Sequence, residues 1–238
     1  PISDITRLNF NLTYDKTDID IGTLPAREIY DFVAAEGNVF ETLSLGFTWQ
    51  RVTLNRGLFP TDGSSTSFTL TSTIPGSDIN YYRANIRQRF YQPLSSQLVF
   101  GFQGELGYLD AYGETDETPF FQNFYAGGPR SLRGFESNTL GPRSTNAPCY
   151  EFNYDDGTCP NLIDTDGDGE LDSPYYNPYA TTNEYSSRSR YRDPPIGGNI
   201  KIEGSLQLIF RLPFIEDQRS LRSAFFFDFG NVFSDNCK

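Results

Sequence analysis

The sequence predicts an all-β fold, namely an antiparallel transmembrane β-barrel fragment of about seven strands, with a short loop helix and one very long extracellular loop. Three observations lead to this prediction. Apolar and polar residues alternate with a period of two in seven separate segments. No run of about 18 apolar residues is present that could form a transmembrane helix. The chain is rich in Phe (21) and Tyr (15), yet its mean hydropathy is only −0.49, as expected where lipid-facing and polar residues alternate.

The alternating segments follow one another along the chain, and each is about long enough to cross a bilayer when tilted. They cover residues 8–14, 43–50, 68–74, 82–90, 98–108, 200–210 and 225–230. A helix is predicted over 24–37, with Pro25 near its start and Gly37 at its end. Turns are predicted at 75–78, 93–96 and 213–220. Residues 112–197 form one loop, far longer than ordinary connections, and such a loop is either functional or disordered.

The same alternation would also fit a soluble β-sandwich, but two features favour the barrel. The apolar face ends in aromatic residues, as an interfacial girdle would: Tyr14, Trp49, Tyr82 and Tyr108. The opposite face carries charges that suit a wet lumen better than a sandwich core: Arg83, Arg87, Arg89 and Glu105.

Composition excludes several functions. The net charge of −12 argues against a nucleic-acid partner. Histidine is absent, which removes the commonest general base and metal ligand. No catalytic triad, phosphate-binding loop or paired acid site stands out, so the sequence predicts a protein that is not an enzyme. Methionine is also absent and the chain starts at Pro1 in mid-pattern, which suggests a fragment of a longer protein.

The long loop contains two cysteines close together, Cys149 and Cys159, and Cys237 lies near the end of the chain. A pair plus a single cysteine suits an oxidising compartment with one short disulfide, Cys149–Cys159. The alternative is three unrelated free thiols.

An acidic stretch follows in the same loop, and it resembles the start of a calcium-binding loop. Its candidate ligands are Asp164, Asp166, Asp168, Glu170 and Asp172. Tyr175 stands where a complete EF-hand needs a bidentate Glu, so the site would be incomplete and weak. The alternative is a solvated acidic loop. No cofactor is required by the predicted fold, and Ca²⁺ is the one candidate.

The first part of the long loop carries a motif of twelve residues, FYAGGPRSLRGF, at 124–135. Gly127 and Gly128 permit a tight backbone, and Gly134 lets Arg133 and Phe135 point apart at a loop tip. Alone, Arg-Gly-Phe is a weak signal that a surface turn would explain. Its setting is specific, because a glycine pair and a transmembrane-type strand precede it and two further strands follow.

With this motif the chain resembles the BamA family of outer-membrane protein insertases, in which Arg-Gly-Phe or Arg-Gly-Tyr lies at the tip of a loop folded back into the barrel lumen. Further matches cover nearly the whole chain in the same order. They are NRGLFPTDG at 55–63, TIPGSD at 73–78, RGFESNTLGP at 133–142, GGN at 197–199 and FFFDFGNVF at 225–233.

The resemblance implies a partner for Arg133, the inward-facing carboxylate of Asp228, since a guanidinium inside a barrel needs an acceptor and can make two parallel hydrogen bonds to a carboxylate. By the alternation count, Asp228 indeed falls on the polar face. Gln207 departs from the family, whose members often carry a glutamate there, and Glu203 on the same face could substitute for it. The alternative for Asp228 is an ordinary lumen carboxylate neutralised by Lys201 or Arg222.

The resemblance also implies a function. Residues 1–238 would be part of a C-terminal transmembrane barrel domain, and the loop at 112–197 would face outside or fold into the lumen. The parent protein would be the central barrel component that folds and inserts β-barrel proteins into the bacterial outer membrane, where an open seam offers backbone groups to an incoming strand. Its partners would be nascent barrel proteins, accessory lipoproteins and the lipid bilayer.

Two other functions compete with this one. The first is a sibling of the same superfamily, a translocation-assembly or two-partner-secretion transporter barrel. The second is a passive porin, which would not explain the Arg-Gly-Phe loop. In the family, the seam is formed by the first and last strands of the barrel, which the seven predicted strands do not include. We therefore expect no insertase activity from this chain alone.

Overall fold

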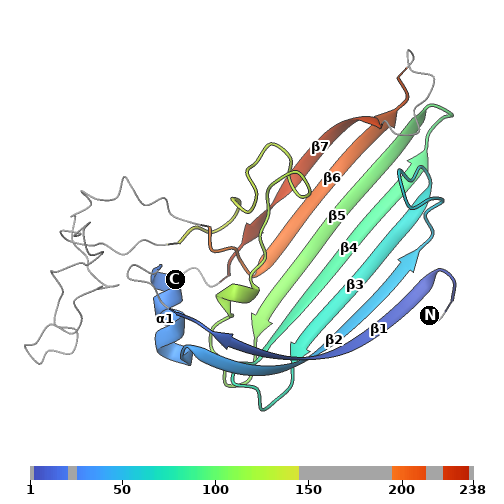
Figure 1. Ribbon diagram of the computed structural model, residues 1–238. Helices are drawn as coiled ribbons and strands as arrows, with labels where there is room; N and C mark the ends of the chain where they lie inside the picture. The colour runs from blue at the N-terminus through green and yellow to red at the C-terminus, as the bar shows by residue number, and fades with distance from the viewer. Residues whose placement is uncertain (1–2, 21–25, 145–194, 213–221, 236–238) are drawn as a thin grey trace, which may run out of the picture. The chain divides into compact units, whose positions relative to one another are not determined.

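The computed structural model describes residues 3–20, 26–144, 195–212 and 222–235 of the 238-residue chain (Figure 1). In these residues seven strands form one sheet, and each strand lies beside its neighbour in sequence. The strands are β1 (Thr6–Asp18), β2 (Val39–Val52), β3 (Gly63–Thr73), β4 (Tyr81–Pro93), β5 (Leu98–Ala111), β6 (Ile200–Phe210) and β7 (Ser223–Phe233). The prediction of an all-β fold with seven strands is confirmed. A sandwich would need a second sheet, and all seven described strands belong to one.

The registers that the structure gives are antiparallel from β2 through to β7. Several strands extend beyond their predicted limits. Strand β3, for example, begins at Gly63, although the apolar pattern starts only at Phe68. The polar residues before Phe68 continue the ladder, with Ser65 opposite Arg89 and Ser67 opposite Arg87. Backbone hydrogen bonds between strands do not require apolar side chains. Strand ends made of Ser and Thr therefore cannot be recognised from alternating apolar and polar residues.

The two faces of the sheet differ sharply, because successive side chains of a strand point to opposite sides. One face carries large apolar side chains that are left exposed, such as Phe10 (75 %), Phe225 (70 %) and Phe227 (64 %). We call this the outward face. The other, inward face carries polar and charged side chains, and there Lys201 and Ser205 are buried. The apolar outward face is thus the exposed one, although a soluble protein would cover such a face. The polar inward face is the one that is covered.

The chain divides into two compact units, residues 1–15, 41–142 and 197–238 in the first and residues 16–40 and 143–196 in the second. The second unit contains the helix α1 (Arg27–Glu36), which lies inside the predicted range 24–37. Helix α1 ends at Gly37, which has φ of +98° and donates its N–H to Val33 O at 2.9 Å. Phe32 is buried, as is Phe40, and their rings lie 5.8 Å apart. In the ranges that the structure covers, no helix is long and apolar enough to cross a membrane.

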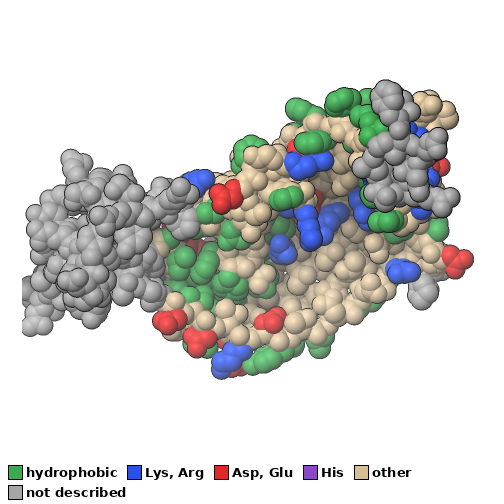
Figure 2. All heavy atoms as spheres, turned by 45° about the horizontal axis from the view of Figure 1, so that its top comes forward, with side chains coloured by type: hydrophobic (Ala, Val, Ile, Leu, Met, Phe, Trp, Pro, Cys, Tyr) green, Lys and Arg blue, Asp and Glu red, His purple; other side chains and the backbone are tan. Residues whose placement is uncertain are grey.

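The first part of the long loop, residues 112–142, lies on the inward face of the first unit. Between β5 and β6, residues 112–142 include the short 3₁₀ helix η1 (Phe120–Gln122), and their trace passes beside β5, β6 and β7 (Figure 1). A cavity of about 1020 Å³ lies between this segment and the inward face. Figure 2 shows Lys and Arg side chains gathered in the hollow, and its lining includes Arg87, Arg89, Arg130 and Lys201.

Two of the predicted turns join neighbouring strands. At 75–78, Ser77 N–H donates to Ile74 O at 3.1 Å between β3 and β4. At 93–96, Leu94 N–H donates to Leu98 O at 2.9 Å, which closes the β4–β5 hairpin. The turn predicted at 213–220 lies outside the described residues.

Candidate functional site

The candidate site is built from residues 124–142, which we call the loop segment, and from the inward face of β4 to β7. The backbone of the loop segment turns at glycines, with φ of +106° at Gly127, +100° at Gly128 and +92° at Gly134. Other residues rarely adopt these angles. A side chain at Gly127 would also collide with the loop itself, since its Cβ would lie 2.5 Å from Glu136 O. The glycine pair therefore serves a compact turn, as the sequence suggested.

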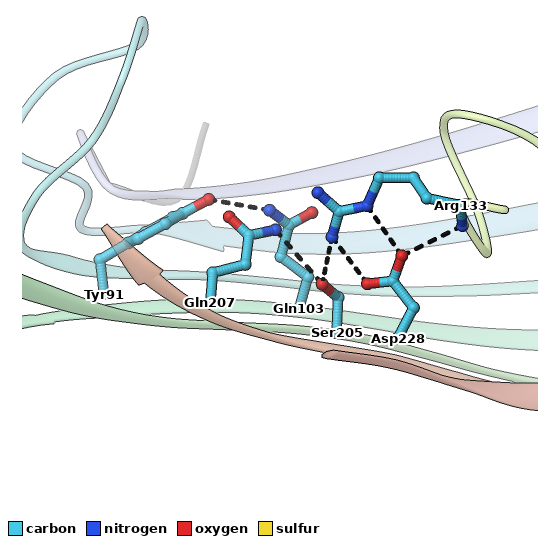
Figure 3. Close-up of polar contacts among 6 residues, drawn as sticks. All are labelled: Tyr91, Gln103, Arg133, Ser205, Gln207 and Asp228. Carbon is cyan, nitrogen blue, oxygen red and sulfur yellow. Dashed lines mark hydrogen bonds and ion pairs between the residues drawn. The ribbon is translucent and has the colours of Figure 1, made fainter. Parts of the chain in front are cut away.

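Arg133 meets Asp228 through two parallel hydrogen bonds (Figure 3). Its Nε lies 2.7 Å from Oδ2 of Asp228, and its Nη2 lies 2.6 Å from Oδ1. The backbone N–H of Arg133 also donates to Oδ2, at 3.0 Å. The Asp228 side chain is only 5 % exposed and that of Arg133 is 31 % exposed. Charge-assisted bonds in this geometry are among the strongest polar contacts available to a protein.

Two further groups hold the guanidinium. Nη2 donates to Ser205 Oγ at 2.8 Å, and Cζ lies 3.5 Å from the centre of the Phe226 ring. Ser205 on β6 stands directly opposite Asp228 on β7, so sheet register brings both oxygens to one place. Phe226 precedes Asp228 by two residues and shares its face. Sequence reasoning missed Ser205 and Phe226: the alternation places both on the inward face, but it does not show which inward residues the loop meets.

The alternative partners for Asp228 are engaged elsewhere. Lys201 lies 3.5 Å from Glu105 and 3.3 Å from Glu203, measured from Nζ to the nearest carboxylate oxygen. Arg222 places its Cζ 5.2 Å from the centre of the Tyr91 ring. The carboxylate of Asp228 is therefore balanced by the loop, through Arg133.

Glu203 does not take the role suggested for it, as a replacement acceptor for Arg133. Its carboxylate accepts a hydrogen bond from the hydroxyl of Ser131 instead, at 2.5 Å. Gln207 donates to Ser205 Oγ at 3.3 Å and so reaches Arg133 only indirectly (Figure 3). Glu203 and Ser205 share a face of β6, but Glu203 lies two residues earlier along the strand. It therefore faces an earlier part of the loop than Ser205 does.

The loop segment is also held at its beginning, by Phe124. Its backbone exchanges two hydrogen bonds with Gly198, at 2.8 and 3.1 Å. Its ring is 3 % exposed and lies against Gly107 of β5, where an added Cβ would approach the ring to 2.7 Å. The guanidinium carbon of Arg83 lies 4.1 Å from the centre of the same ring. The absence of a side chain at Gly107 thus creates the space that Phe124 fills.

The remaining predicted residues lie elsewhere. Phe135 of the Arg-Gly-Phe motif is 54 % exposed, on the far side of Gly134 from Arg133. Cys149 and Cys159, and all five candidate calcium ligands, fall outside the described residues, so both of these stay predictions. The described ranges hold no cluster of three or more His, Cys, Asp or Glu that could bind a metal ion. What the site does chemically is to fasten a loop to a sheet by paired charges.

Comparison with known proteins gives consistent similarities. A family model for the Omp85 superfamily domain matches residues 1–238. The chain is 30 % identical over 240 residues to outer membrane protein assembly factor BamA of Neisseria meningitidis serogroup B, covering 98 % of this chain and 25 % of that protein. The crystal structure of BamA from Haemophilus ducreyi lacking POTRA domains 1–3 matches with a TM-score of 0.70 and 28 % identity, over 98 % of this chain and 40 % of that one. The chain thus spans about a quarter of the length of the curated relative.

Proposed function

Because this chain belongs to the Omp85 superfamily, we propose that it forms part of the barrel wall of a factor that folds and inserts β-barrel proteins into the bacterial outer membrane. Both relatives described above are named BamA, and the first is named an outer membrane protein assembly factor. The observation that carries the proposal in this chain is the docking of Arg133 on Asp228. This contact joins the Arg-Gly-Phe motif of the long loop to the inside of the wall. A passive porin would not explain that motif.

The outward face supports a place in the outer membrane. Its exposed Phe and Leu side chains would be costly in water but favourable against lipid. Neighbouring strands from β2 to β7 pair along continuous antiparallel ladders, which satisfies backbone groups as a wall inside a bilayer requires. We propose that residues 1–238 belong to a transmembrane barrel domain and that residues 112–197 are its long loop, facing outside or folded into the lumen.

The loop segment acts as a brace in this proposal. Insertion requires that one seam of a barrel opens and presents backbone N–H and C=O groups to an incoming strand. A wall that opens at one place must hold its curvature elsewhere. Arg133 fixes the loop to β6 and β7 together, and Phe124 fixes it to β5, so the loop spans three neighbouring strands.

The partners follow from this mechanism. They are nascent outer-membrane β-barrel proteins, accessory lipoproteins of the assembly complex and the bilayer itself. The protein would bind client strands and offer its own strand edge as a template. It would neither break nor form covalent bonds, so we propose that it is not an enzyme. The client is driven to pair with the seam because its backbone N–H and C=O groups would otherwise enter the lipid without hydrogen-bond partners.

The test uses the full-length protein in liposomes, supplied with an unfolded model barrel protein whose folded form resists SDS at room temperature. Asp228→Asn should lower the yield of folded client at least 10-fold, because breaking a buried charge pair costs on the order of 3 kcal/mol and about 1.4 kcal/mol already corresponds to a factor of ten. Asp4→Asn changes an exposed aspartate and should leave the yield unchanged. A yield with Asp228→Asn equal to that of the parent would contradict the brace. Export of a polypeptide with no client folding would favour the secretion-transporter alternative.

A further inference from the structure

Ser131, two residues before Arg133, makes a contact with the sheet that the Arg-Gly-Phe motif does not include. Its hydroxyl donates to Oε2 of Glu203 and accepts the N–H of Gly127, at 3.1 Å. The N–H of Ser131 donates to Gly128 O at 3.1 Å, and Leu132 O accepts from Gly128 N–H at 3.2 Å. One hydroxyl therefore ties the glycine turn of the loop segment to β6.

The two loop contacts match the spacing of β6. Ser131 bonds to Glu203, and Arg133 bonds to Ser205, so positions two apart in the loop meet positions two apart in the strand. Side chains two apart on a strand share a face. The loop segment thus lies on the inward face in a defined register. With Arg133 as its one contact to β6, residues 126–133 could still turn about that point, whereas two contacts to β6 fix the direction of this stretch along the strand.

Glu203 is an unusual acceptor, because it stands directly opposite Glu105 in the register of β5 and β6. Like charges at opposed positions repel each other. Lys201 relieves the repulsion by lying within 3.5 Å of both carboxylates, and Arg87 of β4 places its Nε 3.0 Å from Glu105. The side chains of Lys201, Glu203 and Glu105 are only 10 to 13 % exposed.

Gly230 of β7 completes the arrangement. It pairs with Glu203 in the register of β6 and β7, and a Cβ added there would lie 3.0 Å from Glu203 Cβ and 2.6 Å from its Cα. Its φ of +147° is also one that L side chains rarely adopt. The row from Arg87 through Glu105 and Glu203 therefore ends at a glycine that gives Glu203 room. Oε2 of this carboxylate meets both Lys201 Nζ and the hydroxyl of Ser131.

We propose that Ser131 and Glu203 form a second docking point for the loop segment, separate from Arg133 and Asp228, and that Lys201, Glu105 and Arg87 hold Glu203 in place to receive it. Both are positioning residues. The inference rests on the proposed function only for its purpose, because the contact itself can be measured without any client protein. It also connects the brace to β4, through the ion pairs that join Glu203 to Lys201, Lys201 to Glu105 and Glu105 to Arg87.

Amide hydrogen exchange of the full-length protein in detergent micelles tests the proposal, read in peptides covering 126–136. Ser131→Ala and Glu203→Gln should each speed exchange in this segment about 10-fold, since a hydrogen bond to a charged group is lost or weakened. The double variant should exchange about as fast as either single one, because both changes break the same contact. Glu136→Gln alters an exposed carboxylate of the same loop and should have no effect.

The outcomes separate this contact from a purely internal ion pair. If Glu203 serves only to neutralise Lys201, Glu203→Gln will speed exchange in β5 and β6 and leave residues 126–136 unchanged, and the proposal falls. Multiplicative effects of the two changes, about 100-fold together, would also overturn it. Client folding is measured separately. Loss of loop protection with full folding activity would uphold the docking point and count against the proposed brace, whereas intact protection in Ser131→Ala would refute the docking point alone.

Discussion

At the scale of single residues, the planar guanidinium of Arg133 is what the site requires. Two parallel bonds reach the two oxygens of Asp228 while the same nitrogen, Nη2, also reaches Ser205. The flat group also lies 3.5 Å from the centre of the Phe226 ring. An ammonium group carries the same charge but offers neither the fork nor the flat surface.

Arg133→Lys should therefore weaken the docked loop by about 2 kcal/mol despite keeping the charge. The measurement is amide exchange at residues 126–136 of the full-length protein, which should become faster by more than 10-fold. Arg130→Lys makes the same chemical change at an exposed position three residues earlier. If the two variants behave alike, the geometry of the fork is unimportant.

Gly107 gives a second residue-scale prediction. Gly107→Ala should push the Phe124 ring away, and the ring has little freedom to move because it is buried and Arg83 lies on its face. We expect a loss of about 1–3 kcal/mol, as in other overpacked sites, seen as a lower midpoint of urea unfolding in micelles. Gly57→Ala, where an added Cβ meets nothing within 4 Å, serves as the control. An unchanged midpoint for Gly107→Ala would mean that Phe124 is not confined.

The sequence could predict some of these residues and not others. Arg133 and Asp228 are charged and occur in recognisable motifs, and Asp228 falls on the polar side of the alternation in its strand. Ser131 and Ser205 carry no such signal, because serines are common and their roles depend on how the loop is registered on β6. Glu203 was identified as inward-facing, but its partner depends on a shift of two residues that only the folded loop fixes.

At the scale of elements, the strands are defined by their two faces more than by their ends. The alternation identified all seven strands and, for most of the large apolar residues, the outward face on which they lie. It could not locate the polar ends, such as residues 63–67 of β3, where backbone pairing continues without apolar side chains. The helix α1 was found by its terminal Gly37, since a positive φ there ends the helix for a local reason.

The outward face supplies a prediction at this scale. Leu206 of β6 stands between Phe102 of β5 and Phe227 of β7 in one row of the sheet. Leu206→Arg should cost about 2–4 kcal/mol if this row faces the bilayer core. The measurement is unfolding by denaturant in lipid vesicles. Gln50→Arg introduces the same group on the inward face, where it lines the cavity, and should cost much less. Equal costs would show that the outward face does not contact lipid.

At the scale of the whole molecule, β1 and β7 each have one strand neighbour in the described sheet. Edge strands present unpaired backbone groups, and in a bilayer each such group is expensive. The wall described here therefore needs further strands at both edges, or further copies, before it can close. The docking residues of the loop segment and of the sheet nevertheless all lie in one chain, within the first compact unit.

We expect the 238-residue chain alone to give no client folding in liposomes above the level of empty vesicles. The physical reason is that templating needs a closed barrel with one controlled seam, whereas this sheet has two open edges. The measurement is the yield of SDS-resistant client, with the full-length protein as the positive control. Folding by the chain alone would show that neither closure nor the seam is required.

The two-residue spacing of the loop contacts has a consequence for changes in chain length. Ser131 contacts Glu203 and Arg133 contacts Ser205, with the same two-residue spacing in the loop and in β6. One residue inserted or deleted at Leu132 would change the spacing in the loop but not in the strand. Neither contact could then form without breaking the other. A one-residue insertion is usually harmless in a surface loop, but here it should be as damaging as a one-residue slip within a sheet. Natural variation in loop length should therefore avoid 131–133.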